Sequence, residues 1–420
     1  MTTRKFSVVF AATLAFFALA LLLTSTYAVT QTEKVLFSFQ GKKRSFPAGH
    51  LIFDAAGNLY GTTGEGGAYG DGSVFELSPT PDGGWTEQVL HSFNFTNGQY
   101  PYANLIFDSV GNLYGTTLRG GAHANGTVFE LLPKVGGGWT EKVLHNFSAT
   151  GTEGTSPFTN LIFDAAGNLY GTAYSGGDVA CVTDNGGACG TVFELSPTGA
   201  GDWTLRVLHR FKGTDGAYPV AGVIFDAFGN LYGTTSGGGP SLLNQLGTVF
   251  ELSPTASGTW AEKVLHHFKT ADDGNQPFAG LIFDATGNLY GTTPYGGDGA
   301  GSNGTVFELS PTATGDWIEK VLYSFITAAD GAVPYAGLIR DAAGNLYGTT
   351  SLGGANHYGT VFELSPTGVG KWTERVLRSF NGADGNDPQA DLTMDTVGNL
   401  YGTTVEGGAH RDGTVFEITR

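Results

Sequence analysis

The sequence has few charged residues and very few basic ones, and each shortage narrows the possible folds and functions. Charged residues make up 14% of the 420-residue chain, which argues against a long exposed helix or a disordered chain. Lysine and arginine number 21 against 38 aspartates and glutamates, a formal net charge of −17. Binding to phosphate groups needs clustered basic residues, so we expect neither nucleic acid nor an anionic membrane surface as a partner.

Long apolar runs are also rare, and the one that stands out lies at the N-terminus. A positively charged start precedes the apolar run from Val8 to Leu23, and Thr26-Tyr27-Ala28 follows as a small-residue cleavage site. This order is typical of a secretory signal peptide. We expect residues 1–28 to be removed and residues 29–420 to be exported, periplasmic or extracellular, without a membrane span. An uncleaved membrane anchor is the alternative.

Cysteine is scarce as well, since Cys181 and Cys189 are the only two in the sequence. Both lie in a lengthened, Gly-rich loop, and in an exported protein such a pair is typical of a disulfide that closes the loop. A metal site would need further ligands nearby, for which Asp178 and Asp184 are the candidates. We therefore predict a disulfide, and we expect no metal and no cofactor.

Glycine, by contrast, is abundant, with 67 residues, and much of it belongs to a repeat. Gly-Asn-Leu-Tyr-Gly-Thr occurs seven times at spacings of 54 to 62 residues, and Gly-(Thr/Ser)-Val-Phe-Glu occurs seven times in step with it. Two markers with one period indicate a repeat fold. The first motif begins at Gly57, Gly111, Gly167, Gly229, Gly287, Gly344 and Gly398.

Each repeat contains four short strand-like segments, which in the first repeat are residues 51–54, 58–63, 73–78 and 85–93. Four antiparallel strands per unit match a propeller blade better than a solenoid coil or a sandwich. The last repeat lacks its fourth segment, whereas Thr32 to Phe39 is a fourth segment without a preceding unit. We predict an all-β, seven-bladed β-propeller of four-stranded antiparallel blades, in which the N-terminal strand completes the last blade.

Two acidic positions recur in all seven repeats, an Asp after the first strand and a Glu in the third. A catalytic site needs a few unlike groups in one place, whereas a residue present in every repeat serves the blade itself. We expect the Asp to shape a tight turn, and the Glu to form an ion pair with a basic residue of the fourth strand. We identify no catalytic residues.

The repeats differ most in two connections, one between the second and third strands and one between successive blades. Both lie on the same face of the ring, and loops on a rigid scaffold are where binding residues normally lie. We expect this face to bind an extracellular glycan, peptide or protein, although polar loops that are merely solvated would look the same. The candidate ligand-binding residues are Glu65, Tyr69, Asp71, Arg119, His123, Tyr174, Asp178, Tyr295, Asp298, His357, Tyr358, Glu406, His410 and Arg411.

The motifs Asp-Ala-Ala-Gly-Asn-Leu-Tyr-Gly-Thr-Thr and Gly-Thr-Val-Phe-Glu-Leu resemble the tandem repeats of secreted bacterial proteins of the GloVer-containing, or choice-of-anchor, type. The resemblance covers essentially the whole mature chain and implies no established activity. A more distant similarity, in Asp-x-x-Gly-Asn-Leu-Tyr, is to NHL and streptogramin-lyase propellers, which include both binding modules and a metal-dependent lyase.

We therefore expect a monomeric binding module without catalysis. One alternative is a metal-dependent lyase or hydrolase that uses His357, His410 and Glu406 on the same face. The other is a structural envelope protein without a small ligand.

Overall fold

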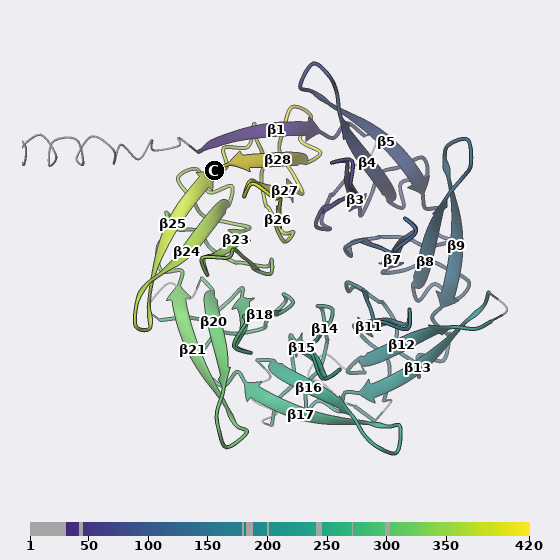
Figure 1. Ribbon diagram of the computed structural model, residues 1–420, viewed down its shortest axis with the longest axis vertical. Helices are drawn as coiled ribbons and strands as arrows, with labels where there is room; N and C mark the ends of the chain where they lie inside the picture. Colours follow the sequence, from purple (N-terminus) through teal and green to yellow (C-terminus); the bar gives the residue numbers. More distant parts are fainter. Residues whose placement is uncertain are drawn as a thin grey trace, which may run out of the picture.

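The chain folds into a ring of seven four-stranded β-sheets, which is the predicted propeller (Figure 1). The structure is a computed structural model that describes residues 31–41, 45–178, 180–181, 188–199, 201–240, 246–270, 272–298 and 303–420. Among these residues, no helix is long and apolar enough to cross a membrane. The predicted signal peptide, residues 1–28, lies outside the described residues.

In blades 1 to 6 the four strands run from the ring axis outwards in chain order, and neighbouring strands are antiparallel in all seven blades. Blade 1 contains β2 (Ile52–Phe53), β3 (Leu59–Thr63), β4 (Ser73–Pro79) and β5 (Trp85–Ser92). Blade 2 contains β6 (Ile106–Phe107), β7 (Leu113–Thr117), β8 (Thr127–Pro133) and β9 (Trp139–Asn146). Blade 3 contains β10 (Ile162–Phe163), β11 (Leu169–Ala173), β12 (Thr191–Pro197) and β13 (Trp203–Arg210). Blade 4 contains β14 (Ile224–Phe225), β15 (Leu231–Thr235), β16 (Thr248–Pro254) and β17 (Trp260–His267).

The remaining blades follow the same plan. Blade 5 contains β18 (Ile282–Phe283), β19 (Leu289–Thr293), β20 (Thr305–Pro311) and β21 (Trp317–Ser324). Blade 6 contains β22 (Ile339–Arg340), β23 (Leu346–Thr350), β24 (Thr360–Gly368) and β25 (Lys371–Ser379). Blade 7 contains β26 (Thr393–Met394), β27 (Leu400–Thr404), β28 (Thr414–Thr419) and, as its outer strand, β1 (Thr32–Ser38).

Blade 7 confirms the predicted ring closure, because its strands come from both ends of the chain. β1 pairs with β28 in antiparallel register, with Lys34 opposite Glu417 and Val35 opposite Phe416. In Figure 1 the purple β1 lies beside the yellow β28. Backbone hydrogen bonds between the two ends therefore close the ring.

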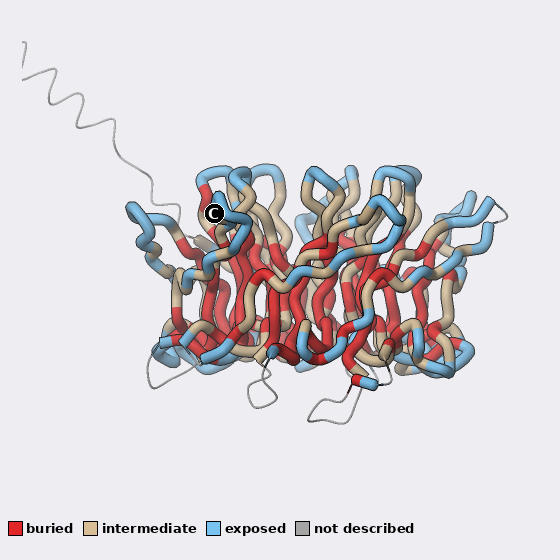
Figure 2. Tube along the Cα trace, turned by 90° about the horizontal axis from the view of Figure 1, so that it is seen from below, coloured by how far each residue is buried: buried red, intermediate tan, exposed pale blue. Residues whose placement is uncertain are grey.

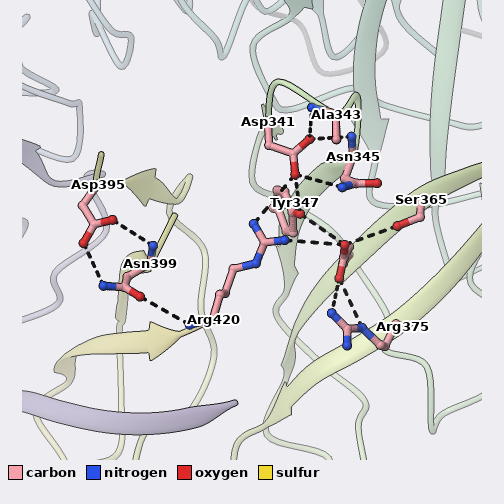
Figure 3. Close-up of polar contacts among 10 residues, drawn as sticks. Asp341, Ala343, Asn345, Tyr347, Ser365, Arg375, Asp395, Asn399 and Arg420 are labelled. Carbon is pink, nitrogen blue, oxygen red and sulfur yellow. Dashed lines mark hydrogen bonds and ion pairs between the residues drawn. The ribbon is translucent and has the colours of Figure 1, made fainter. Parts of the chain in front are cut away.

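The C-terminal residue Arg420 adds a second link, between blades 7 and 6 (Figure 3). Its guanidinium lies 3.8 Å from Asp341 and 3.7 Å from Glu363, and its Cζ lies 4.3 Å from the centre of the Tyr347 ring. Its backbone N–H donates to Asn399 Oδ1 of blade 7, at 3.3 Å. The end of the chain is thus held by ion pairs and a cation–π contact as well as by the sheet.

The core consists of layers between neighbouring blades. The second strand of each blade is buried along its whole length, and the third strand contributes a fully buried Phe, such as Phe75. That ring packs against a glycine of the second strand: a Cβ on Gly61 would lie 2.6 Å from the Phe75 ring. Phe93 of blade 1 meets Phe129 of blade 2 edge to face at 5.0 Å, which joins the two blades. The glycine of the repeat motif therefore makes room for the buried Phe.

The recurrent Asp shapes the turn between the first and second strands, as expected. Asp54 Oδ1 accepts the N–H groups of Ala56 and Asn58, and Asp54 Oδ2 accepts Asn58 Nδ2 and Tyr60 Oη. The same four bonds recur in all seven blades. Burial opposes ionisation, but these donors outweigh it and hold the pKa of Asp54 below its usual range. This carboxylate satisfies the turn's own polar groups.

The expected ion pair between the third and fourth strands needs a correction. The register is as predicted, for example Glu251 opposite Lys263. Nζ of Lys263, however, donates to the Gly315 carbonyl of the next blade at 2.6 Å, and Lys34, Lys142 and Lys320 make equivalent bonds. Among the described residues, the pair with Glu forms in blades 3 and 6, where the base is Arg206 or Arg375. A long basic side chain reaches past its own sheet, and Arg206 also donates to the Gly258 carbonyl of the next blade, so five of these contacts connect blades.

The two faces of the ring differ in the connections they carry. One face carries the turns between the first and second strands and between the third and fourth. The other, which we call the loop face, carries the connections between the second and third strands and between blades. Figure 2 shows buried backbone in the middle of the ring and exposed backbone at both faces.

Candidate functional site

The connection between blades is built the same way seven times. The residue before its proline has a left-handed backbone: Phe46, Tyr100, Ser156, Tyr218, Gln276, Val333 and Asp387 have φ between 53° and 59°. This conformation is uncommon for residues other than glycine and costs about 1–3 kcal/mol. Strain of this kind persists where the surroundings fix the backbone, and it is often found at functional sites.

Two hydrogen bonds fix this backbone between neighbouring blades. The Tyr100 N–H donates to the Asp71 carbonyl of the preceding blade at 3.0 Å, and its own carbonyl accepts the Leu118 N–H at 3.0 Å. Both bonds recur at Ser156, Tyr218, Val333 and Asp387. The connections are therefore held rigidly, and each one presents the residue after its proline to the ring axis.

These residues after proline form a funnel around the axis on the loop face. Together with Leu118 and Tyr174 they enclose a hollow of about 510 Å³. Four of the seven are aromatic, so the wall of the funnel is largely apolar. The residues after proline are Ala48, Tyr102, Phe158, Val220, Phe278, Tyr335 and Gln389.

Aromatic contacts organise the funnel wall. Tyr100 and Tyr102 stack at 5.8 Å with 9° between their planes, and Tyr102 meets Phe158 at 5.6 Å. Tyr295 and Tyr335 share a hydrogen bond of 2.8 Å between their hydroxyls. Burial, with the charge of Glu65 and the neighbouring Tyr100, raises the pKa of Tyr102 to about 12. Tyr102 is therefore uncharged at neutral pH and can act as a hydrogen-bond donor.

The floor of the funnel is formed by the residues three positions after each proline, and it is polar on one side only. His50, Asn104, Asn160 and Asp391 line one side, and Gly222, Gly280 and Gly337 lie opposite. Asn104 Oδ1 accepts the His50 N–H at 2.7 Å, and Asn160 Oδ1 accepts the Asn104 N–H at 3.0 Å. Asp391 Oδ1 accepts the Gly337 N–H at 2.5 Å. The floor thus has a fixed polar arc facing residues without side chains.

The structure brings some of the predicted ligand-binding residues to the funnel. Tyr174 lines the hollow, Tyr295 supports Tyr335, and Glu65 lies near enough to influence Tyr102. Tyr358, Glu406 and Arg411 meet in a separate hollow of about 760 Å³ near blades 6 and 7. Tyr69 lines a third, near the N-terminal strand.

The other predicted residues lie on the loop face outside the funnel. Asp71 accepts a hydrogen bond from Gln99 Nε2 at 2.7 Å. Asp178 is half-buried, and the side chains of Arg119, His123, Asp298, His357 and His410 are exposed. Within the described ranges, no three His, Cys, Asp or Glu residues are grouped so that they could hold a metal ion. His357, His410 and Glu406 therefore do not form the metal site that the lyase alternative requires.

Sequence reasoning missed the funnel ring and the polar arc of its floor. The signal was available in the sequence, because the first residue after the connecting proline is aromatic in four repeats and the third residue after the proline is His, Asn or Asp in four. The prediction instead favoured polar residues in the longest loops.

The predicted disulfide is present between Cys181 and Cys189, whose Cα atoms are 5.9 Å apart. The Cys189 carbonyl accepts the N–H of the left-handed Tyr218 at 2.9 Å, and Tyr218 stacks on Tyr174 at 5.0 Å. The disulfide therefore supports one side of the funnel mouth.

The sequence profile of the Gloeobacter/Verrucomicrobia repeat matches residues 22–181 and 243–420. The chain belongs to this repeat family. No curated protein sequence matches the chain. Among solved structures, a candidate 6-phosphogluconolactonase from Bacteroides uniformis is similar, with a TM-score of 0.51 and 15% identity over 82% of this chain and 88% of that one. At 15% identity, this similarity shows only that the two proteins share the propeller fold.

Proposed function

We propose that the protein is an exported, non-catalytic binding module that takes a carbohydrate in its central funnel. The observation that carries the proposal is the ring of aromatic side chains around a hollow of about 510 Å³. Small-ligand sites are usually apolar concavities of about 300–1,000 Å³ with a few placed polar groups. Aromatic rings suit the C–H faces of sugar rings, and the phenol and amide groups of the funnel suit sugar hydroxyls.

The rigidity of the funnel supports a small ligand rather than a broad protein surface. Each connection is clamped by hydrogen bonds to two blades, as at Tyr100, so little ordering is required on binding. A preformed site loses less conformational entropy when its ligand binds. Peptide and protein partners, which the sequence leaves open, become outcomes of the experiment below.

The disulfide supports the exported location, because disulfides persist in oxidising compartments. A monomer remains our expectation.

The test is isothermal titration calorimetry of residues 29–420 with oligosaccharides that differ in sugar and linkage. Phe158→Ala and Tyr335→Ala each remove one aromatic side chain from the funnel wall. We expect each substitution to weaken binding by about tenfold, or about 1.4 kcal/mol. Phe228→Ala is the matched control, because Phe228 is 87% exposed in a turn on the opposite face.

Binding that resists both funnel substitutions would contradict the proposal. Binding of peptides but of no oligosaccharide would replace the carbohydrate with a peptide ligand. Release of product from a bound sugar would favour the hydrolase or lyase alternative.

A further inference from the structure

A single carboxylate lies at the floor of the funnel, beneath its aromatic ring. Asp391 lines a narrow space of about 100 Å³ together with Tyr102, Phe158, Phe278 and Tyr335. Its side chain is 29% exposed, and Oδ1 accepts the Gly337 N–H. A ligand that fills the funnel therefore reaches this carboxylate.

The basic group that the structure places beside Asp391 is His50. Among the described residues that line the funnel and its floor, none is a lysine or an arginine. His50 Nδ1 lies 3.8 Å from Asp391 Oδ2, which is too long for a hydrogen bond.

The hydrogen bonds of Asn104 also determine whether His50 Nδ1 donates or accepts a hydrogen bond. Asn104 Oδ1 accepts the backbone N–H of His50, so its Nδ2 is the atom 2.9 Å from His50 Nδ1 and must donate. In this arrangement His50 Nδ1 is the acceptor of the Asn104 hydrogen bond. Burial opposes ionisation of Asp391, but the nearby His50, the Gly337 N–H and Asn104 outweigh it and hold the pKa of Asp391 below its usual range, so Asp391 is a carboxylate.

The aromatic ring above the carboxylate favours a cation in the same place. Ammonium groups are attracted to the faces of aromatic rings, more strongly where water is excluded. Burial raises the pKa of Tyr335 and Tyr102, and the nearby carboxyl groups of Asp387 and Glu65 add to the increase, so carboxyl groups lie close to the rim as well. The carboxylate of Asp391 and the aromatic rings above it therefore both favour a ligand with a cationic group.

We propose that the funnel selects sugars with a free amino group, and that Asp391 binds the ammonium. This inference rests on the proposed function and names the class of sugar. Gly280, opposite the arc, leaves room for the sugar, because a Cβ there would meet nothing nearer than the Ala221 Cβ at 4.0 Å. N-acetylation of the amine removes its charge and adds bulk, so it disfavours binding.

The experiment compares glucosamine and N-acetylglucosamine oligomers of equal length, titrated into residues 29–420 at pH 6, where the amine is charged. We expect at least a tenfold preference for the glucosamine oligomer. Asp391→Asn keeps an acceptor for the Gly337 N–H but loses the charge, so the preference falls to near one while the acetylated oligomer still binds. Asp272→Asn, at an exposed position in the connection between blades 4 and 5, is the control that keeps the preference.

Gly280→Gln is a second variant, which fills the floor from another blade and leaves residue 391 as Asp. We expect it to weaken binding of both oligomers, and undiminished affinity for both would overturn the assignment of the floor. Equal wild-type affinities for the two oligomers would overturn the amine preference and leave the carbohydrate proposal standing. No binding of either oligomer would overturn the amino-sugar assignment, and the titrations with other oligosaccharides would then decide the carbohydrate proposal. Tighter binding of lysine peptides would replace the amino sugar with a peptide amine.

Discussion

Four glutamates in the outer strands have a raised pKa, and we therefore predict that the protein is more stable at pH 5 than at pH 8. Glu262 faces residues of the preceding blade, and its Oε1 is buried without a hydrogen-bond partner among the described residues. Burial raises the pKa of Glu262 to about 7; Asp215 adds to the increase, and His209 and Lys212 oppose it. Burial likewise raises the pKa to about 7 at the equivalent residues Glu33, Glu319 and Glu374.

The sign follows from proton binding. A carboxyl with a raised pKa binds its proton more tightly in the folded state, so its stabilising effect is present below the unfolded pKa and is lost as the pH rises through the folded one. One pKa unit corresponds to about 1.4 kcal/mol, but partial hydration of these side chains reduces the effect to about 1 kcal/mol per glutamate. Four glutamates then lower the free energy of unfolding by about 4 kcal/mol between pH 5 and pH 8, or about 5 °C in Tm.

Differential scanning calorimetry of wild type and Glu262→Gln at pH 5 and pH 8 isolates one of these groups. Glutamine keeps the shape but cannot ionise, so we expect equal Tm values at pH 5 and a Tm about 1 °C higher for the variant at pH 8. Burial lowers the pKa of His91 and His267, so these histidines make the folded protein more stable as the pH rises. The comparison of Glu262→Gln with wild type separates the effect of Glu262 from theirs. Asp202→Asn, in an exposed turn, is the control. The same difference between Glu262→Gln and wild type at both pH values would refute the reasoning.

Two further substitutions test the closure of the ring and the core. Arg420→Ala removes the ion pairs to Asp341 and Glu363 and the contact with Tyr347, so we expect urea denaturation to show a loss of about 1 kcal/mol, against no change for the exposed Arg411→Ala. An unchanged midpoint would show that the strand pairing alone holds the C-terminus. Gly233→Ala places a Cβ 2.6 Å from the Phe250 ring, so we expect a loss of about 1–3 kcal/mol in the same assay, and full stability would mean that the blade layers can shift.

The architecture was predictable because its repeat unit occurs seven times in the sequence. The repeat gives the four strands, and the unpaired segment from Thr32 to Phe39 predicts that the N-terminus completes the last blade. The turn role of Asp54 follows from local chemistry within a few residues. Each of these features depends on residues close together in the sequence or on the repeat period itself.

The funnel and the links between blades were harder to predict, because they depend on residues far apart in the chain. Tyr102 and Tyr335 lie in different repeats and meet at the axis only once the ring closes. Lys263 was expected to pair with Glu251 of its own blade, but it binds a backbone carbonyl of the next one, and no side-chain pattern marks such an acceptor. His50 and Asp391 come together only because blades 1 and 7 are neighbours in the closed ring.

The most direct test of the binding account is a crystal structure of residues 29–420 with a glucosamine oligomer. The account predicts a sugar in the funnel, against the rings of Tyr102 and Phe278, with its amine within hydrogen-bond distance of Asp391. A sugar bound instead in the hollow of Tyr358 and Arg411, with the funnel filled by water, would contradict it.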